Sequence, residues 1–465
     1  MKRTMIGIIL LSIFMLGVGR AAHAGEMDVL VNKLVEKGVL TPAEAQIIVE
    51  DTRLQVSKDL AQAKSLSVPE WTQRIKWGGD VRYRTQGDWG KTRRNETPST
   101  GTLTKEQRIR QRVRGRFYTE GKVNDFTYAG VRFAGGNADE RSTNDTLDAY
   151  FDKKFVMFDQ YYMRFEAPSD IVRKFGQYFS DLKFWAGRFP IPFEYSELVW
   201  DSDSNPQGMA FQYVSPDIKT GFLPDLNAYS NLGMFWLTEQ AQNNNDSILY
   251  GYQVGLKTDV FGPLGTQANL GIAYYDFANM RGKIAGAYSS GTNTRSMVGA
   301  ANEYRYEYQI LDVLLTLDNS KIMDINFPHG FYTDFIHNPR APLGNGLLVG
   351  GYVGKKKIKD PGDWKARAEW RYIERDSIPD FMPDSDFYGF GTWVTPYSNA
   401  LGQGTNGIPS GGGTNGKGIN LAFEYQLLKN TALNIEYYWM EPIKVSDTIS
   451  KNPYNEFQFD VITKF

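Results

Sequence analysis

The stretch Phe457-Gln458-Phe459-Asp460-Val461-Ile462-Thr463-Lys464-Phe465 alternates apolar and mainly polar side chains and ends on an aromatic residue. Successive side chains of a strand point to opposite faces of a sheet, so Phe457, Phe459, Val461, Thr463 and Phe465 share one face. That face suits lipid, and the opposite face suits water. The pattern predicts a strand with one apolar side at the C-terminal end of this sequence.

The N-terminal segment has the composition of a secretory signal. Lys2 and Arg3 precede an apolar run that ends at Val18, and Ala22-His23-Ala24 supplies a small-residue cleavage site. The run is shorter than the roughly 20 apolar residues that a helix needs to cross a bilayer of ~30 Å. We therefore expect residues 1–24 to be removed on export. No other apolar stretch approaches this length, so a membrane-spanning chain would have to cross as a closed barrel of strands.

The composition excludes several classes of function. The chain has 52 Lys and Arg against 53 Asp and Glu, and loss of Lys2, Arg3 and Arg20 with the signal would leave 49 against 53. Such balance argues against a nucleic-acid partner. The absence of cysteine excludes a disulfide framework, a thiolate metal site and a covalent haem attachment. With 27 Tyr, 28 Phe and 46 Gly, the composition favours strands, tight turns and aromatic girdles.

The sequence divides into a short helical leader and a long strand-rich region. Thr41-Pro42-Ala43-Glu44 is a capping box that predicts the start of a helix, and Pro69 ends the helical pattern. We expect residues 25–68 to form a periplasmic helical segment. It is either a tethered helical hairpin or a segment that oligomerises or contacts the cell wall. Residues 69–465 are expected to form the barrel.

Alternating apolar and polar residues predict strands throughout the second region. About 390 residues at roughly 22–26 per strand and loop give an antiparallel barrel of 16–18 strands, a size that encloses an aqueous channel. The clearest strands are 81–85, 108–118, 126–133, 248–260, 268–275, 364–373, 419–427 and 433–439. External loops are expected at 87–105, 239–246, 279–302 and 397–417. Residues 153–183 read either as a strand pair or as a loop with a helical turn, and a bulge would explain a slip in alternation after Tyr308.

Arginine recurs at every second position of one predicted strand. At ~3.4 Å per residue, side chains two positions apart are rooted about 7 Å apart on one face. Each would cost roughly 2–4 kcal/mol near the middle of the lipid, so the row must face the lumen of a barrel. The row consists of Arg108, Arg110, Arg112, Arg114 and Arg116. Arg82 and Arg84 of the preceding predicted strand and Arg132 of the following one fit the same inward side and complete the candidate pore-lining residues. They predict an anion-attracting wall, or alternatively a solvated face paired with carboxylates across the sheet.

Two sets of acidic residues are candidate partners for the arginines. Asp148 and Asp152 are expected to share a face of the next strand and to line the pore. Glu197, Asp201 and Asp203 belong to an acidic loop that would form a constriction if it folds inward, and that otherwise lies at the wet external rim.

No catalytic or metal site is expected. The stretch from Asp201 to Asn205 opens like a calcium-binding loop, but Pro206 and Gln212 replace the required glycine and glutamate, so neither a metal nor another cofactor is predicted. The chain also lacks a nucleophile motif such as Gly-x-Ser-x-Gly.

Two neighbouring segments carry a family resemblance. Gly187-Arg188-Phe189-Pro190-Ile191-Pro192-Phe193 is followed by Leu198-Val199-Trp200-Asp201-Ser202-Asp203-Ser204-Asn205-Pro206-Gln207-Gly208-Met209-Ala210-Phe211-Gln212-Tyr213. This pattern resembles that of a family of porins of Gram-negative outer membranes. The last strand, which ends on Phe465, also resembles the closing strand of outer-membrane barrels. Gln207 departs from the resemblance, because a glutamate is expected there.

These observations together predict an outer-membrane porin rather than an enzyme. It would pass small hydrophilic solutes, anions in preference, and would sit in outer-membrane lipid as a homo-oligomer, a trimer being one option. An alternative is a structural or docking barrel, a sheath in an envelope complex such as an electron-transfer conduit. A barrel hydrolase would require an exposed catalytic site that the sequence does not indicate.

Overall fold

The computed structural model describes most of the strand-rich region and a small part of the leader. The described residues are parts of 33–51, and 70–465 without 95–102, 137–138, 140, 222–223, 242–244, 284–291, 299–300, 323–324, 391–396, 399–403, 406–412 and 444–452. The chain forms two compact units, Met1–Gln73 and Arg74–Phe465. Within the described residues, no helix is long and apolar enough to cross a membrane.

The N-terminal unit confirms the predicted capping box. The Thr41 backbone N–H donates to Glu44 Oε2 at 2.9 Å, and the Glu44 N–H donates to Thr41 Oγ1 at 3.3 Å. These reciprocal bonds satisfy two amides that the first helical turn leaves free. Helix α4 (Glu70–Gln73) ends this unit. The predicted signal and most of the predicted helical segment lie outside the described residues.

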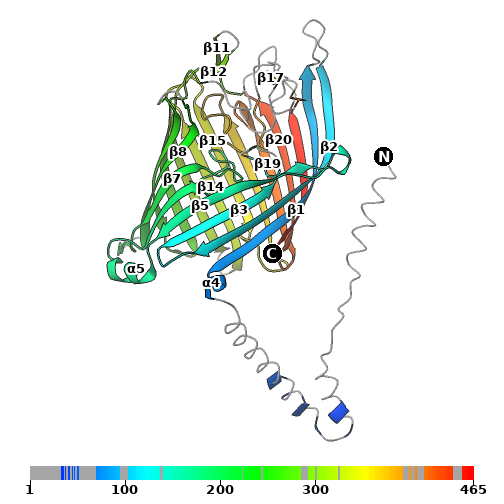
Figure 1. The fold of residues 1–465 in the computed structure, drawn as a ribbon, viewed down its shortest axis with the longest axis vertical. Coiled ribbons are helices and arrows are strands. Elements are labelled where there is room, and N and C mark those ends of the chain that lie inside the picture. The colour runs from blue at the N-terminus through cyan, green and yellow to red at the C-terminus, as the bar shows by residue number, and fades with distance from the viewer. Residues whose placement is uncertain are drawn as a thin grey trace. The chain divides into compact units, whose positions relative to one another are not determined.

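The second unit is a closed antiparallel barrel (Figure 1). Its first eight strands are β1 (Ile75–Arg94), β2 (Leu103–Lys122), β3 (Thr127–Gly135), β5 (Val156–Glu166), β6 (Asp181–Arg188), β7 (Gln207–Val214), β8 (Leu226–Thr238) and β9 (Ser247–Thr258). The remaining eight are β10 (Thr266–Ala278), β13 (Tyr308–Ile322), β14 (Ile325–His337), β15 (Asn345–Gly354), β16 (Trp364–Ile373), β19 (Gly416–Leu428), β20 (Thr431–Pro442) and β21 (Tyr454–Lys464). Each strand pairs with the next in this order, and β21 pairs with β1, so the described strands form a ring of 16. The count lies at the lower end of the predicted range.

The segments that connect the barrel strands contain several shorter elements. They are β4 (Asp145–Thr146), η1 (Ala149–Phe151), α5 (Ser169–Phe175), the hairpin β11 (Arg295–Val298) with β12 (Ala301–Tyr304), and the short pair β17 (Tyr397–Ser398) with β18 (Gly404–Thr405). Of these, β4 pairs with the edge of β2 and adds a short strand to the sheet outside the ring.

Short turns join the strands at one end of the barrel, and longer loops join most of them at the other. In barrels of this kind the short turns face the periplasm and the long loops face outward. The connections at the long-loop end that are described at least in part are L2 (136–155), L3 (189–206), L4 (239–246), L5 (279–307), L6 (338–344), L7 (374–415) and L8 (443–453). Residues 95–102, between β1 and β2, lie outside the described residues. The prediction of a loop over 87–105 is wrong at both ends, because β1 runs to Arg94 and β2 starts at Leu103.

Two ambiguous segments have clear structures. Residues 153–183 form both predicted alternatives, because β5 and β6 flank the helical turn α5. The expected bulge near Tyr308 is wrong, since the register of β13 against β10 is continuous from Tyr308 to Asn319. The slip in alternation has two causes: Tyr304 belongs to a separate strand, and the inward side of β13 is itself apolar, with Tyr308 and Ile310 buried.

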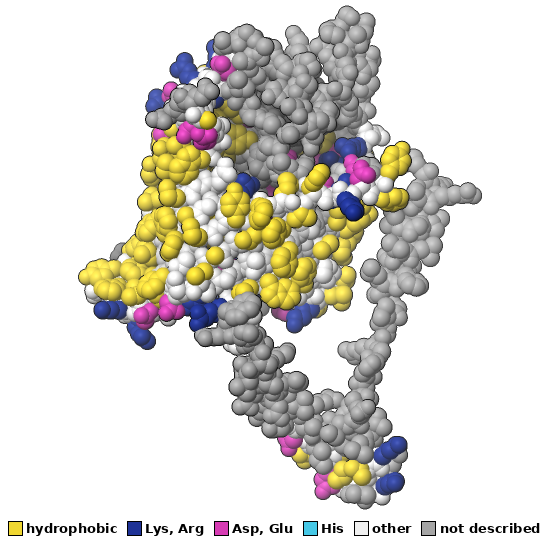
Figure 2. All heavy atoms as spheres, viewed as in Figure 1, with side chains coloured by type: hydrophobic (Ala, Val, Ile, Leu, Met, Phe, Trp, Pro, Cys, Tyr) yellow, Lys and Arg dark blue, Asp and Glu magenta, His cyan; other side chains and the backbone are white. Residues whose placement is uncertain are grey.

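The predicted alternation of the last three strands is confirmed. Leu421 and Phe423 of β19 are exposed on the outside, whereas Asn420, which precedes Leu421 and faces inward, is buried. Glu456, Gln458 and Asp460 of β21 are fully buried on the inward side. The outer surface is correspondingly rich in apolar side chains (Figure 2). The lumen of this part of the barrel is therefore polar.

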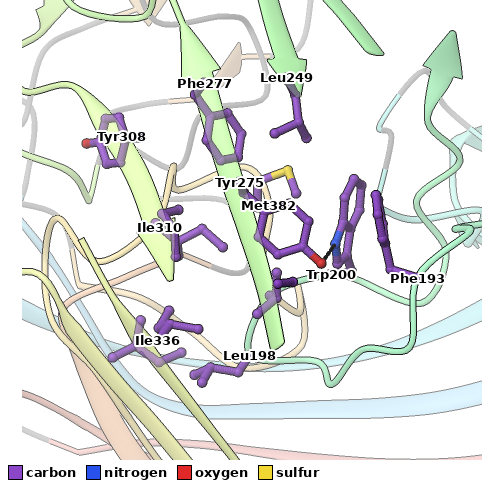
Figure 3. Packing of buried hydrophobic residues seen from close by; sticks show 14 of the residues in the cluster. Phe193, Leu198, Trp200, Leu249, Tyr275, Phe277, Tyr308, Ile310, Ile336 and Met382 are labelled. Atoms are coloured by element: carbon purple, nitrogen blue, oxygen red, sulfur yellow. Dashed lines mark hydrogen bonds between the residues drawn. The ribbon is translucent and has the colours of Figure 1, made fainter. Parts of the chain in front are cut away.

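An apolar core fills the opposite part of the lumen. L3 folds inward, and its Phe193, Leu198 and Trp200 pack against inward side chains of the wall such as Tyr275 and Ile310 (Figure 3). The Trp200 indole N–H donates to the Tyr275 hydroxyl at 3.3 Å, which satisfies a polar group inside this core. The core holds L3 across the barrel. On the other side of L3, inward side chains of β1, β2, β20 and β21 border a polar space that we call the polar passage.

Candidate permeation site

The arginine row lies on the inward face of β1 and β2. The register places Arg82 opposite Arg114 and Arg84 opposite Arg112, so guanidinium groups of two strands share one surface. Outward neighbours such as Val81 and Tyr83 are exposed, whereas Arg82 and Arg84 are buried. Alternation along the strands therefore aims the row into the lumen.

Most of these arginines form ion pairs with carboxylates. Arg84 donates to both oxygens of Asp460 at 2.7 and 2.9 Å and lies 3.2 Å from Asp386. Arg114 and Arg116 share Asp80, at 2.8 and 2.7 Å. The further pairs are Arg110 with Asp88 at 3.5 Å and Arg132 with Asp159 at 2.5 Å. The face is thus a charge network rather than a bare cationic wall.

Arg112 and Arg82 are less completely compensated. Among the described residues, Arg112 has no carboxylate within 4.0 Å, and it donates to Gln86 Oε1 at 3.0 Å and to the Asn144 carbonyl at 3.3 Å. Arg82 donates to Asn144 Oδ1 at 2.5 Å and lies 3.8 Å from Asp460, which also forms the ion pair with Arg84. Arg108 belongs to the same row, but its side chain is exposed towards the long-loop end.

The two sets of predicted acidic partners differ in position. The expectation that Asp148 and Asp152 share a strand face is wrong, because they flank η1 in L2 and are exposed; Asp148 pairs with Lys154 at 2.9 Å. The L3 acids do lie inside the barrel. Asp203 is 3.3 Å from Arg116.

A second inward loop contributes acids that sequence reasoning missed. L7 places Asp384 and Asp386 beside L3, where the Asp384 N–H donates to the Glu197 carbonyl at 3.1 Å. The Ser385 N–H donates to Asp201 Oδ2 at 2.8 Å. The spacing of the two L7 aspartates was visible in the sequence, but no local pattern shows that a loop folds inward.

A buried cluster joins L3 and L7 to β16. Arg371 is fully buried and donates to Asp384 at 2.6 Å, to Glu197 at 2.8 Å and to Glu369 at 2.7 Å. Arg367 pairs with Glu369 and Glu436. Sequence alternation over 364–373 already placed Glu369 and Arg371 on one face, although no role was assigned to them.

Burial and crowding perturb the loop carboxyls in opposite directions. Burial, with the neighbouring charge of Glu197, raises the pKa of Asp384 to about 7 although Arg371 opposes the shift. Burial and the charges of Asp384 and Asp203 raise the pKa of Asp201 well above its usual range. Burial would raise the pKa of Asp386, but Arg84, with further contributions from Gln458, Arg112 and Arg82, outweighs burial and lowers that pKa to about 2. The acidic side therefore changes charge near neutral pH, whereas Asp386 stays ionised.

These groups surround a small polar cavity of about 130 Å³. Its lining is Arg82, Arg84, Arg114, Arg141, Ser142, Asn144, Glu197, Asp201, Ser202, Asp203, Asp384, Ser385, Asp386, Asn434, Glu436, Tyr438, Asp460 and Ile462. Arginines of the wall thus face carboxylates of L3 and L7 across a narrow space. Such an arrangement can sort solutes by size and by charge. Within the described residues, no cluster of three or more acidic or histidine side chains could hold a metal ion.

Comparisons with known proteins place the chain in a family. The model of the family described as "Putative porin" matches residues 90–324 and 338–404, which is more than half of the chain. Similar solved structures include OprB of Pseudomonas putida, with 10% identity, a TM-score of 0.48, and 85% of this chain and 95% of that chain covered. OmpF of Salmonella typhi in complex with daunomycin has 9% identity and a TM-score of 0.41, and the match covers 84% of this chain and 97% of OmpF. OmpT of Vibrio cholerae has 12% identity and a TM-score of 0.40, and the match covers 84% of this chain and 97% of OmpT. No curated protein sequence matches the chain. The chain therefore belongs to the family described as "Putative porin" and forms an outer-membrane β-barrel of the porin type.

Proposed function

We propose that this protein is a diffusion porin that passes small hydrophilic solutes and favours small anions. The observation that carries the anion preference is Arg112, a lumen-facing guanidinium that has no carboxylate partner among the described residues. A unit charge contributes about 1 kcal/mol at ~4 Å even in bulk water, which corresponds to several-fold enrichment of anions. Arg82 adds to this field because its nearest carboxylate is shared.

The acidic side of the passage gives the field a direction. Glu197, Glu369, Asp384 and Glu436 share only Arg367 and Arg371 as direct partners among the described ion pairs. A permeating solute would therefore meet excess positive charge on one side and excess negative charge on the other. Anions would follow the β1–β2 wall, and dipolar solutes would orient across the passage.

The test is the reversal potential of the purified protein in a planar bilayer under a KCl gradient. We expect anion preference in the wild type and a several-fold smaller chloride-to-potassium permeability ratio in Arg112→Gln. Arg164→Gln is the matched control, because Arg164 pairs with Glu120 at 3.0 Å near the short-turn end. A cation-preferring wild type, or an Arg112→Gln variant with unchanged selectivity, would contradict the assigned role.

The same recording separates the porin from a sheath or docking barrel. A folded barrel that shows no stepwise conductance would favour the docking role, and a copurifying partner would then be expected to fill the passage. We also propose a homo-oligomer, with a trimer as the first hypothesis. Its test is the mass of the detergent-solubilised protein, and a monomeric mass would overturn it.

A further inference from the structure

L2 runs from the lumen to the outside of the barrel. Its first half is internal: Arg141 and Asn144 are buried and line the polar cavity. The loop then passes along β2, where β4 pairs with Arg112 and Val113 and the Leu147 N–H donates to the Gln111 carbonyl at 2.8 Å. This route is open because β3 ends at Gly135, so that its pairing with β2 stops at Arg116 and β4 takes its place further along the edge.

The second half of L2, residues 147–155, forms an exposed knob that we call the aromatic knob. The side chains of Tyr150 and Phe151 are 100% and 103% exposed, and Phe155 is 81% exposed. Most other exposed aromatic side chains of the outer wall have about half that exposure. Figure 1 shows the loop that follows β3 projecting beyond the wall beside β2, and Figure 2 shows hydrophobic and charged side chains together at its end.

The backbone of the knob is strained in a way that presents these rings. Tyr150 and Phe151 both have left-handed φ angles, of 52° and 70°. Two consecutive non-glycine residues rarely adopt this conformation, which costs free energy unless the surroundings favour it. Both rings are fully exposed, so none of the described residues covers them.

The height and surroundings of the knob point to lipid. Val113, which pairs with Asp145 of β4, lies nine residues before the end of β2 at Lys122. At ~3.4 Å per residue and a tilt of about 45°, this is roughly 22 Å above the short turns, close to the upper edge of an apolar band about 25 Å tall. Aromatic girdles occupy that edge in outer-membrane barrels.

The knob is continuous with the apolar outer wall. Phe155 leads directly into β5, whose Phe158 lies 4.9 Å from Phe133 and 6.1 Å from Tyr161, measured between ring centroids. Lys153 follows the aromatic pair and suits the headgroup region, whereas Lys154 pairs with Asp148 within the knob at 2.9 Å. We propose that the aromatic knob inserts its rings into the outer leaflet of the bilayer and so anchors the half of L2 that lines the passage.

Site-directed spin labelling tests the insertion without any transport measurement. The chain has no cysteine, so Phe151→Cys gives a single labelling site. Nitroxide accessibility is measured for the protein in phosphatidylcholine vesicles, to oxygen, which concentrates in lipid, and to a nickel chelate, which stays in water. Val254→Cys on the outward face of β9 is the lipid reference, and Asp125→Cys in a short turn is the water reference.

We expect the label at position 151 to match the Val254 reference, with high oxygen and low nickel accessibility. High nickel accessibility would overturn the proposal by placing the knob in water. Low accessibility to both reagents would overturn it in favour of a second copy that covers the knob.

The anchoring role rests on the proposed porin function and needs a separate readout. In the double variant Tyr150→Ser, Phe151→Ser, a freed L2 should raise the open-channel current noise several-fold while the protein still folds as a heat-modifiable barrel. Tyr178→Ser is the matched control, since Tyr178 is an exposed aromatic residue in a short turn. Noise equal to that of the control would overturn the anchoring role. If the wild type showed no conductance, this would count against the porin function, but it would not affect the spin-label result.

Discussion

Asp384 shows how one buried carboxyl can make selectivity depend on pH. Its pKa is raised to about 7 by burial and by Glu197, so it binds a proton as the pH falls from 8 to 6. Protonation removes a negative charge from the cavity, and the high pKa of Asp201 acts in the same direction. We therefore expect anion preference to increase as the pH falls through 7, by up to several-fold in the permeability ratio.

The reversal potential of Asp384→Asn between pH 5.5 and 8.5 tests this assignment. The variant should show at pH 8 the stronger anion preference that the wild type reaches only at lower pH, and its profile should be flatter. Asp363→Asn is a suitable control, because Lys355 lowers the pKa of Asp363 to about 2 and this group lies in a short turn. A variant profile that keeps the wild-type midpoint would exclude Asp384 as the titrating group.

At the scale of the element, L3 is held by apolar packing rather than by the strand ladder. Trp200 is 3% exposed and contacts Phe193, Phe235 and Tyr275 inside the barrel. Trp200→Ala should cost about 3–5 kcal/mol of packing free energy at this site. Because the wall hydrogen bonds are unaffected, the loss should loosen L3 and raise the single-channel conductance while the barrel persists.

Single-channel recording and denaturant unfolding together check this prediction. Trp77→Ala is the control, since Trp77 is 66% exposed on the outer face and should change the conductance little. Unchanged conductance in Trp200→Ala would mean that L3 is held in place without this core.

At the scale of the whole molecule, β21 closes the ring. It pairs with β20 on one side and with β1 on the other, and the Phe465 N–H donates to the Gly79 carbonyl at 3.0 Å. Without it two strand edges would be left unpaired in lipid, where each unsatisfied backbone group costs several kcal/mol. Deletion of residues 454–465 should therefore abolish the heat-modifiable form and the conductance.

Deletion of residues 25–68 should leave both the heat-modifiable form and the conductance intact, because the barrel begins at Arg74 as a separate unit.

The sequence by itself determined the barrel class, the strand faces and the inward direction of the arginine row. The reason is physical: alternation is a local property of the pleat, so Phe457 and Phe459 point outward and Asp460 inward without reference to any other strand. The same alternation placed Arg112 and Arg114 in the lumen. It failed where inward residues are also apolar, as in β13, because period-two contrast disappears when both faces are covered.

Only the tertiary structure decided which loops fold inward and which carboxylate meets which arginine. Asp386 reaches Arg84 over 302 positions of sequence, and Asp203 reaches Arg116 over 87. Loop placement depends on long-range packing, here the core around Trp200, and charges pair wherever that packing brings them. Asp148 and Asp152 illustrate the limit: their spacing suited a strand face, but the chain leaves the wall between β4 and β5 and carries them to the outer surface.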